Sequence, residues 1–147
     1  MMIKQISIFV ENKFGRLAKI TETLGNNNID ISALSLADTT DFGVLRLIVD
    51  KPELAVEVLR ESGVVAKCTE VVGVAMNNTP NGLSEVLNVL TDNDIVIEYM
   101  YTFVGRRHGK AMMVVKTDDM EKSVKVLEEK GIEVMDGAFA DFERRNL

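Results

Sequence analysis

The segment NKFGRLAKITETLGNNNIDI, residues 12–31, contains two hydrophobic periodicities in succession. Leu17, Ile20 and Leu24 recur at the spacing that places side chains on one face of an amphipathic helix. Gly25 and the three asparagines that follow it tolerate positive φ angles, which is how helices commonly end. The last residues of the segment alternate apolar and polar side chains, as a half-buried strand does. The segment therefore predicts a loop, a helix and a strand.

The same pattern returns 66 residues further along the chain. A shift of 66 positions places residues 12–31 on NTPNGLSEVLNVLTDNDIVI, residues 78–97, and aligns residues 5–50 without a gap. The identical pairs are Asn12 and Asn78, Leu17 and Leu83, Leu24 and Leu90, Asn27 and Asn93, Ile29 and Ile95, Ile31 and Ile97, and Gly43 and Gly109. Because the apolar pattern agrees as well, the chain contains an internal repeat.

Each copy continues with a second helix and a fourth strand. The second helices are predicted to end at Gly63 and Gly131, and short apolar strands follow them. Each copy is thus βαββαβ, an order in which two helices can cover one face of an antiparallel sheet. The sequence predicts an α+β protein of two tandem ferredoxin-like units, residues 1–69 and 70–147. No Pro- or Ser-containing linker separates them, so the fourth strand of one passes almost directly into the first strand of the next.

Composition restricts the classes of function. The formal charge of −6 and the isoelectric point near 4.9 argue against nucleic acid as a partner, because phosphate binding needs a basic surface. No stretch approaches the roughly 20 apolar residues of a membrane span, and the N-terminal apolar run is too short for a secretory signal. A cytoplasmic location is therefore expected. The single cysteine, Cys68, is expected to be a small buried apolar residue.

Signatures of catalysis are sparse. His108 lies in the basic segment GRRHGK, which we expect to form a solvated hairpin turn. No Ser or Cys has a catalytic partner at a spacing that a known nucleophile motif would require. The acidic segment at 91–98 has Ile97 where a calcium loop needs Gly. We therefore predict no catalytic residue, no metal site and no organic cofactor.

The loop before the first helix also repeats, as ENKFGRL at 11–17 and NNTPNGL at 77–83. Two interpretations stay open. Any strand-to-helix connection favours Asn as a cap and Gly or Pro at the turn. Alternatively, the amides and partial positive charge of a helix start form a site for a carboxylate, which a Gly allows to approach the backbone closely.

At these residues the sequence resembles the ACT family of small ligand-sensing domains. The resemblance covers both copies, and it rests on the loop motif, the helix and the apolar residues that follow. Phe14 stands where the family usually has Pro, and Asn81 stands where it has Gly, while Gly82 comes one place later. The resemblance implies two unequal sites, the first being the better one because Gly15 occupies the family position.

ACT domains hold a ligand between this loop of one unit and the second strand of a neighbouring unit. Transferred by position, the resemblance implies the ligand-binding residues Asn12, Lys13, Phe14, Gly15, Arg16, Leu17, Asp30, Ile31, Ser32 and Ala33 in the first copy, and Asn78, Thr79, Pro80, Asn81, Gly82, Leu83, Val96, Ile97, Glu98 and Tyr99 in the second. It also implies a free amino acid as the small-molecule ligand, a homodimer, and a regulated enzyme that the sequence does not identify.

Two other functions remain possible on the sequence alone. The same fold could be a structural or interaction module whose ligand sites have degenerated. A small enzyme is less favoured, because no set of acid, base and nucleophile is visible.

Overall fold

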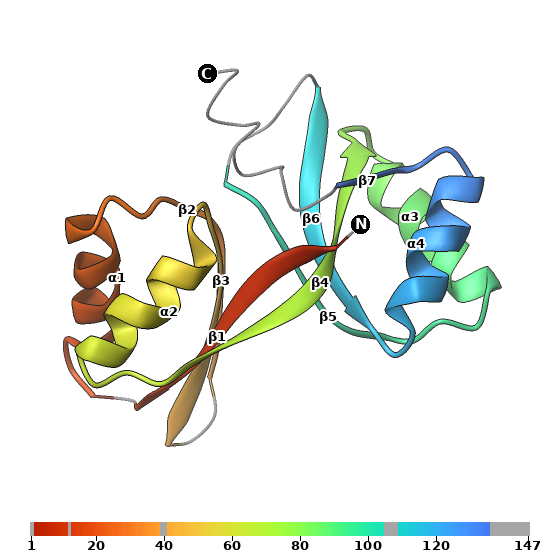
Figure 1. Cartoon of the computed structure of the whole chain (residues 1–147). Coiled ribbons are helices and arrows are strands. Elements are labelled where there is room, and N and C mark those ends of the chain that lie inside the picture. Colours follow the sequence, from red (N-terminus) through yellow and green to blue (C-terminus); the bar gives the residue numbers. More distant parts are fainter. Residues whose placement is uncertain (1, 12, 39–40, 105–108, 136–147) are drawn as a thin grey trace. The chain divides into compact units, whose positions relative to one another are not determined.

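The computed structural model describes residues 2–11, 13–38, 41–104 and 109–135. The chain divides into two compact units, one comprising Lys4–Thr69 and the other comprising Glu70–Leu147 together with Met1–Ile3. Each of them contains two helices, which Figure 1 draws as coiled ribbons.

The first unit has the element order βαββαβ. Its elements are β1 (Ile3–Glu11), α1 (Arg16–Asn26), β2 (Ile31–Asp38), β3 (Phe42–Val49), α2 (Pro52–Glu61) and the beginning of β4 (Ala66–Asn77). The strands are ordered β2-β3-β1-β4, and β3 pairs antiparallel with both β1 and β2. Ile6 lies opposite Leu47 in this register, which fixes which face of the sheet is apolar.

The second unit repeats this order. The remainder of β4 is followed by α3 (Gly82–Asp92), β5 (Ile97–Thr102), β6 (Lys110–Thr117), α4 (Met120–Glu129) and β7 (Glu133–Met135). β4 pairs antiparallel with β6 on one side and with β7 on the other, and β5 pairs with β6. The prediction of tandem ferredoxin-like units in an α+β protein is confirmed, and one uninterrupted strand joins the two copies.

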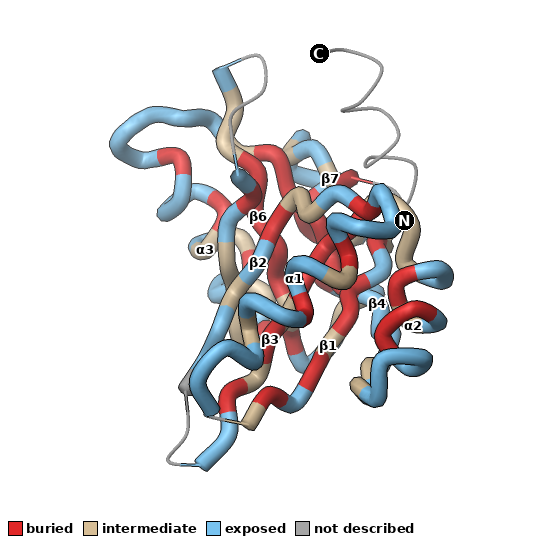
Figure 2. Tube along the Cα trace, turned by 90° about the vertical axis from the view of Figure 1, so that its left-hand side faces the viewer, coloured by how far each residue is buried: buried red, intermediate tan, exposed pale blue. Residues whose placement is uncertain are grey.

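Each unit packs its helices on one face of its strands around an apolar core. Strands and helices of both units carry buried as well as exposed residues (Figure 2), and in the second unit Val71–Ala75 of β4 and Met112–Val115 of β6 are buried without interruption. The fully buried core side chains include Ile6, Ile8, Leu24, Leu45, Leu47 and Leu59 in the first unit, and Val72, Val74, Leu90, Met113 and Leu127 in the second. Several of these occupy equivalent positions of the repeat, so the two cores are built on one pattern.

The helix ends lie close to the predicted stop signals, although Gly25 is still inside α1 and Asn28 is the residue that takes the positive φ angle. Asn28 and Asp94, which are 66 residues apart, have φ angles of 56° and 57° just after α1 and α3. Gly63 and Gly131 have φ angles of 85° and 73° just after α2 and α4. The left-handed region is readily open to Gly and tolerated by Asn and Asp, so these residue types end the helices there.

One prediction about the core is wrong. Cys68 is exposed, not buried. It lies in the first part of β4, where Lys67, Thr69 and Glu70 are exposed too, so neither face of this stretch is covered. The predicted basic turn falls largely on residues 105–108, which lie outside the described residues.

Candidate functional site

The first loop brings an open glycine to the start of α1. Gly15 is the N-cap residue, with a φ angle of +81° that other residue types rarely adopt. No side chain caps the helix, and the backbone amides of Leu17 and Ala18 donate to no described residue. Lys13 and Phe14 are exposed, whereas Asn12 lies outside the described residues. The start of α1 therefore has two amide donors that no described residue satisfies.

A carboxylate at the end of β1 orders this loop. Oε2 of Glu11 lies 2.9 Å from the Lys13 ammonium and 3.7 Å from the Arg16 guanidinium, and this oxygen is inaccessible to solvent. The hydrogen bond and charge of Lys13, with a smaller contribution from Arg16, hold the pKa of Glu11 below its ordinary value. The charge of Glu11 is therefore already matched by two cations of the loop.

The second loop reaches its helix by a different backbone conformation. Asn81, the N-cap residue of α3, has a φ angle of −103°. Gly82 is buried, and a Cβ atom added to it would lie 1.7 Å from the carbonyl oxygen of Asn77. Asn78, Thr79, Pro80 and Leu83 are exposed around it. Gly82 is therefore required by the close approach of α3 to the end of β4, and the two loops differ in shape.

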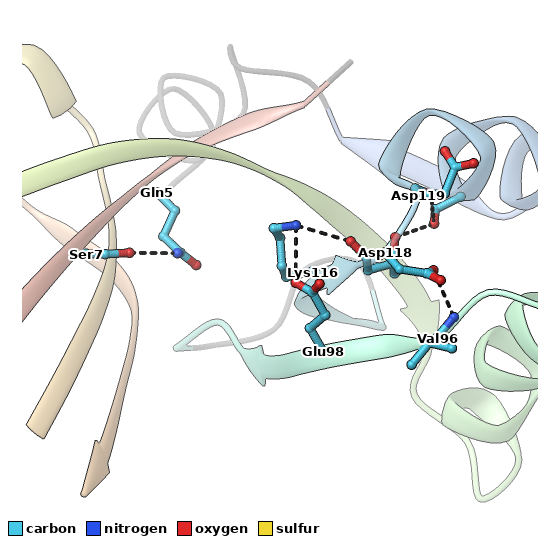
Figure 3. Close-up of polar contacts among 9 residues, drawn as sticks. Gln5, Ser7, Val96, Glu98, Lys116, Asp118 and Asp119 are labelled. Atoms are coloured by element: carbon cyan, nitrogen blue, oxygen red, sulfur yellow. Dashed lines mark hydrogen bonds and ion pairs between the residues drawn. The ribbon is translucent and has the colours of Figure 1, made fainter. Parts of the chain in front are cut away.

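Asp30 and Val96, which were predicted to belong to the second strands, lie one residue before β2 and β5, and their amides are occupied. The amide of Asp30 donates to Oδ1 of Asp50 at 2.9 Å, and the amide of Val96 donates to Oδ1 of Asp118 at 3.0 Å. Figure 3 shows the second of these contacts. The reverse backbone bonds, from the amides of Asp50 and Asp118, are also present. These two amides are thus held within their own units, so a ligand would have to use other groups of the strands.

Both second strands carry a bulge at the same place in the repeat. The register shifts between Ile31 and Ala33 in β2 and between Ile97 and Tyr99 in β5, which leaves Ser32 and Glu98 as the extra residues. Ser32 is half-buried and Ala33 is fully buried, while Ile31, Ile97 and Tyr99 are half-buried. Glu98 is exposed and forms an ion pair of 3.2 Å with Lys116 (Figure 3). Bulges aim a side chain away from the regular alternation, so these positions are the most distinctive of the predicted strand residues.

A cavity of about 300 Å³ adjoins the first loop. It lies between the end of β1, one side of α1 and the connection from α2 to β4, all in the unit Lys4–Thr69. Its charged lining residues are Glu11, Arg16, Lys19 and Lys67. Of the twenty predicted binding residues, Arg16 lines it, and the other described members of the set do not.

The sequence analysis missed Lys19 and Lys67 as candidates. Lys19 follows Arg16 by three residues on a helix, so the spacing alone could have placed both on one face. Lys67 comes from β4, 48 residues further along the chain, and no local pattern connects it with α1.

The part of the chain that the structure describes contains no cluster of three or more His, Cys, Asp or Glu side chains with the geometry of a metal site. Within the same residues, every helix is too short or too polar to cross a membrane.

Comparisons with known proteins agree with this architecture. A protein from Bacteroides thetaiotaomicron of known crystal structure is 40% identical, with a TM-score of 0.86 over 92% of both chains. The regulatory subunit of aspartate kinase from Thermus thermophilus is 15% identical, with a TM-score of 0.62 over 86% of this chain and 91% of that one. The corresponding subunit from Thermus flavus, also 15% identical, has a TM-score of 0.58 over 86% and 90%. These last two show a shared fold. No curated protein sequence matches the chain.

The family is established by the sequence as well as by the fold. The model that describes an ACT domain pair matches residues 1–140, which is nearly the whole chain. The two βαββαβ units, the repeated loop before each first helix and this match lead to one conclusion: the chain belongs to the ACT family, as a tandem pair of ACT domains.

Proposed function

We propose that this ACT domain pair is a non-catalytic sensor that binds a free amino acid and regulates a protein of amino-acid metabolism. ACT domains have regulatory, ligand-binding roles, and two chains that share this fold are by name regulatory subunits of aspartate kinase. In this proposal each of the units 1–69 and 70–147 supplies one loop and one second strand, and the protein acts in the cytoplasm.

The observation that carries the proposal is the unpaired start of α1. The amides of Leu17 and Ala18 donate to no described residue, and Gly15 leaves open space where a side chain would stand. A ligand carboxylate placed there would accept both hydrogen bonds and would interact favourably with the helix dipole. The ligand's ammonium group would be bound by an acidic side chain or carbonyl from the neighbouring second strand.

The proposal includes a homodimer. A site made from the loop of one unit and the strand of another needs a neighbour, and β2 and β5 each pair on one side only among the described strands. A second copy could add a strand at either edge about a twofold axis. Light scattering at tens of micromolar should give twice the chain mass of 16.3 kDa. A strictly monomeric mass would count against this part of the proposal.

A thermal-shift panel of the twenty amino acids tests the sensing role. One amino acid, or a few related ones, should raise the melting temperature, because a ligand that binds only the folded state stabilises it. If none of the twenty amino acids changed the melting temperature, the result would favour the alternative, an interaction module whose ligand sites have degenerated. Treatment with a chelator should leave the shift in melting temperature unchanged. If the chelator abolished the shift and zinc or calcium restored it, the prediction that no metal is needed would be wrong.

Substitutions then locate the site. Gly15→Val is expected to block the amino acid, but at a φ angle of +81° it also strains the backbone. Gly15→Asn is the better variant, since Asn tolerates this conformation while placing a side chain beside the helix-start amides. Asn81→Val, at a φ angle of −103°, should change the affinity much less. Circular dichroism first checks that Gly15→Asn and Asn81→Val are folded. If both then bind the amino acid in calorimetry as the parent does, the loops serve only as helix caps.

A further inference from the structure

The lining of the cavity beside α1 contains three basic side chains and one acidic one. Arg16 and Lys19 approach it from α1, and Lys67 approaches it from β4. Its one carboxylate, Glu11, is already paired with Lys13 and Arg16. Neither Lys19 nor Lys67 forms an ion pair with any residue that the structure describes. Two cations from separate parts of the fold thus line one cavity without an ion-pair partner among the described residues, which favours an anion there.

The rest of the lining is apolar, with hydroxyl groups at intervals. Phe9 and Val65, which are 70% and 79% exposed, contribute apolar surface to the lining. The hydroxyl of Ser7 accepts a hydrogen bond from Nε2 of Gln5 at 3.1 Å, as Figure 3 shows, and a hydroxyl that accepts can also donate to a ligand. The cavity can accommodate an apolar group and an anionic group at once.

A zwitterion fits this lining poorly. An α-amino acid needs an acceptor for its ammonium group, and the carboxylate of Glu11, the only acidic side chain in the lining, is engaged by two cations of the loop. Displacing them would cost about as much as the new contact would gain. An organic acid that lacks an ammonium group has no such requirement, and both of its ends find matching surfaces.

We propose that this cavity is a second ligand site, and that it takes a small organic acid with an apolar side group and no ammonium group, such as a 2-oxo acid. A volume of about 300 Å³ suits a molecule of that size. The site lies wholly within the unit Lys4–Thr69, whereas the proposed amino-acid site needs the second strand of a neighbouring unit. Either proposal can therefore be wrong without affecting the other.

The first test compares two ligands that differ in one group. Isothermal titration with 4-methyl-2-oxopentanoate should show binding, and leucine should bind at this cavity at least about tenfold more weakly. Amide NMR spectra locate the binding, since shifts on Val64 and Val65 report on the cavity, and shifts on Leu17 and Ala18 report on the loop. Equal binding of both ligands at the cavity, or no binding of the oxo acid at millimolar concentration, would overturn the proposal.

Substitutions separate a built site from general attraction of anions. Lys19→Gln and Lys67→Gln should each weaken the oxo acid about tenfold, the usual effect of losing one charged hydrogen bond. Lys125→Gln, an exposed position of α4 with no ion pair to a described residue, removes the same charge elsewhere and should change nothing. Thr23→Phe should obstruct the cavity without altering the charge and should abolish binding.

Two further outcomes would contradict the inference. If sodium sulfate binds as tightly as the oxo acid and Thr23→Phe retains it, the site attracts an adventitious ion only. If Lys19→Gln and Lys67→Gln match Lys125→Gln, the two cations do not form a site. Gly15→Asn should leave the oxo acid unaffected while weakening the amino acid, so failure of the sensing proposal can be distinguished from failure of this one.

Discussion

Replacing Gly82 by Ala should strongly destabilise the protein, although Ala is the best helix former and Gly82 lies in the first turn of α3. An ideal Cβ atom there would lie 1.7 Å from the carbonyl oxygen of Asn77 and 2.8 Å from its carbonyl carbon. These are backbone atoms at the end of β4, so no side-chain rotation relieves the clash. The start of α3 would have to move away from the strand.

The same substitution at Gly15 provides a reference for the size of the stability loss. Gly15 has no atom within 4 Å of an added Cβ, so Gly15→Ala costs only the left-handed strain of an L-residue, about 1–2 kcal/mol. Overpacking typically costs about 1–3 kcal/mol of stability, and more where the neighbouring atoms cannot move away. We therefore expect Gly82→Ala to lower the free energy of unfolding by at least about 3 kcal/mol. Asn81→Ala, at an exposed position with a φ angle of −103°, should stay within about 0.5 kcal/mol.

Urea unfolding followed by circular dichroism measures all three variants against the parent. The midpoint should fall in the order Asn81→Ala, Gly15→Ala, Gly82→Ala, with unchanged slopes if unfolding stays two-state. Gly15→Asn should recover part of the loss of Gly15→Ala, because Asn tolerates positive φ. A Gly82→Ala protein as stable as the parent, or more stable, would refute the packing argument, since helix propensity alone would then govern the position.

Three other outcomes follow from the polar contacts. Lys13→Gln should raise the pKa of Glu11 towards its ordinary value of 4.5, as a carboxyl NMR titration would show, and an unchanged pKa would remove Lys13 as its cause. Because folding lowers this pKa, the stabilisation is present above pH 4.5 and is lost as the pH falls through the folded value, so urea midpoints of the parent and Lys13→Gln should converge in acid. Asp50→Ala and Asp118→Ala should each destabilise the protein by about 1–2 kcal/mol in urea unfolding, because each removes the side-chain acceptor of a backbone amide, that of Asp30 or Val96; a neutral effect at both would mean that water replaces the acceptors.

Local patterns were sufficient for much of the architecture. The helix ends at Asn28, Gly63 and Gly131, and the equivalent end at Asp94, follow from short-range backbone sterics that depend on the residue type itself. The two cores follow from the apolar periodicity, which is a property of neighbouring residues. The repeat reinforced both, because each segment could be read twice.

The candidate sites depended more on contacts between distant segments. The loop residues could be named from the motif, but the φ angle of Gly15 and the clash at Gly82 arise from how each helix meets its strand. The exposure of Cys68 and the presence of Lys19 and Lys67 in the lining of one cavity depend on where β4 begins relative to β1 and α1. Such contacts join residues far apart in the chain, and they form only when strand order and register close the intervening loops. Periodicity within a segment carries no information about that closure, so the cavity emerged only from the tertiary structure.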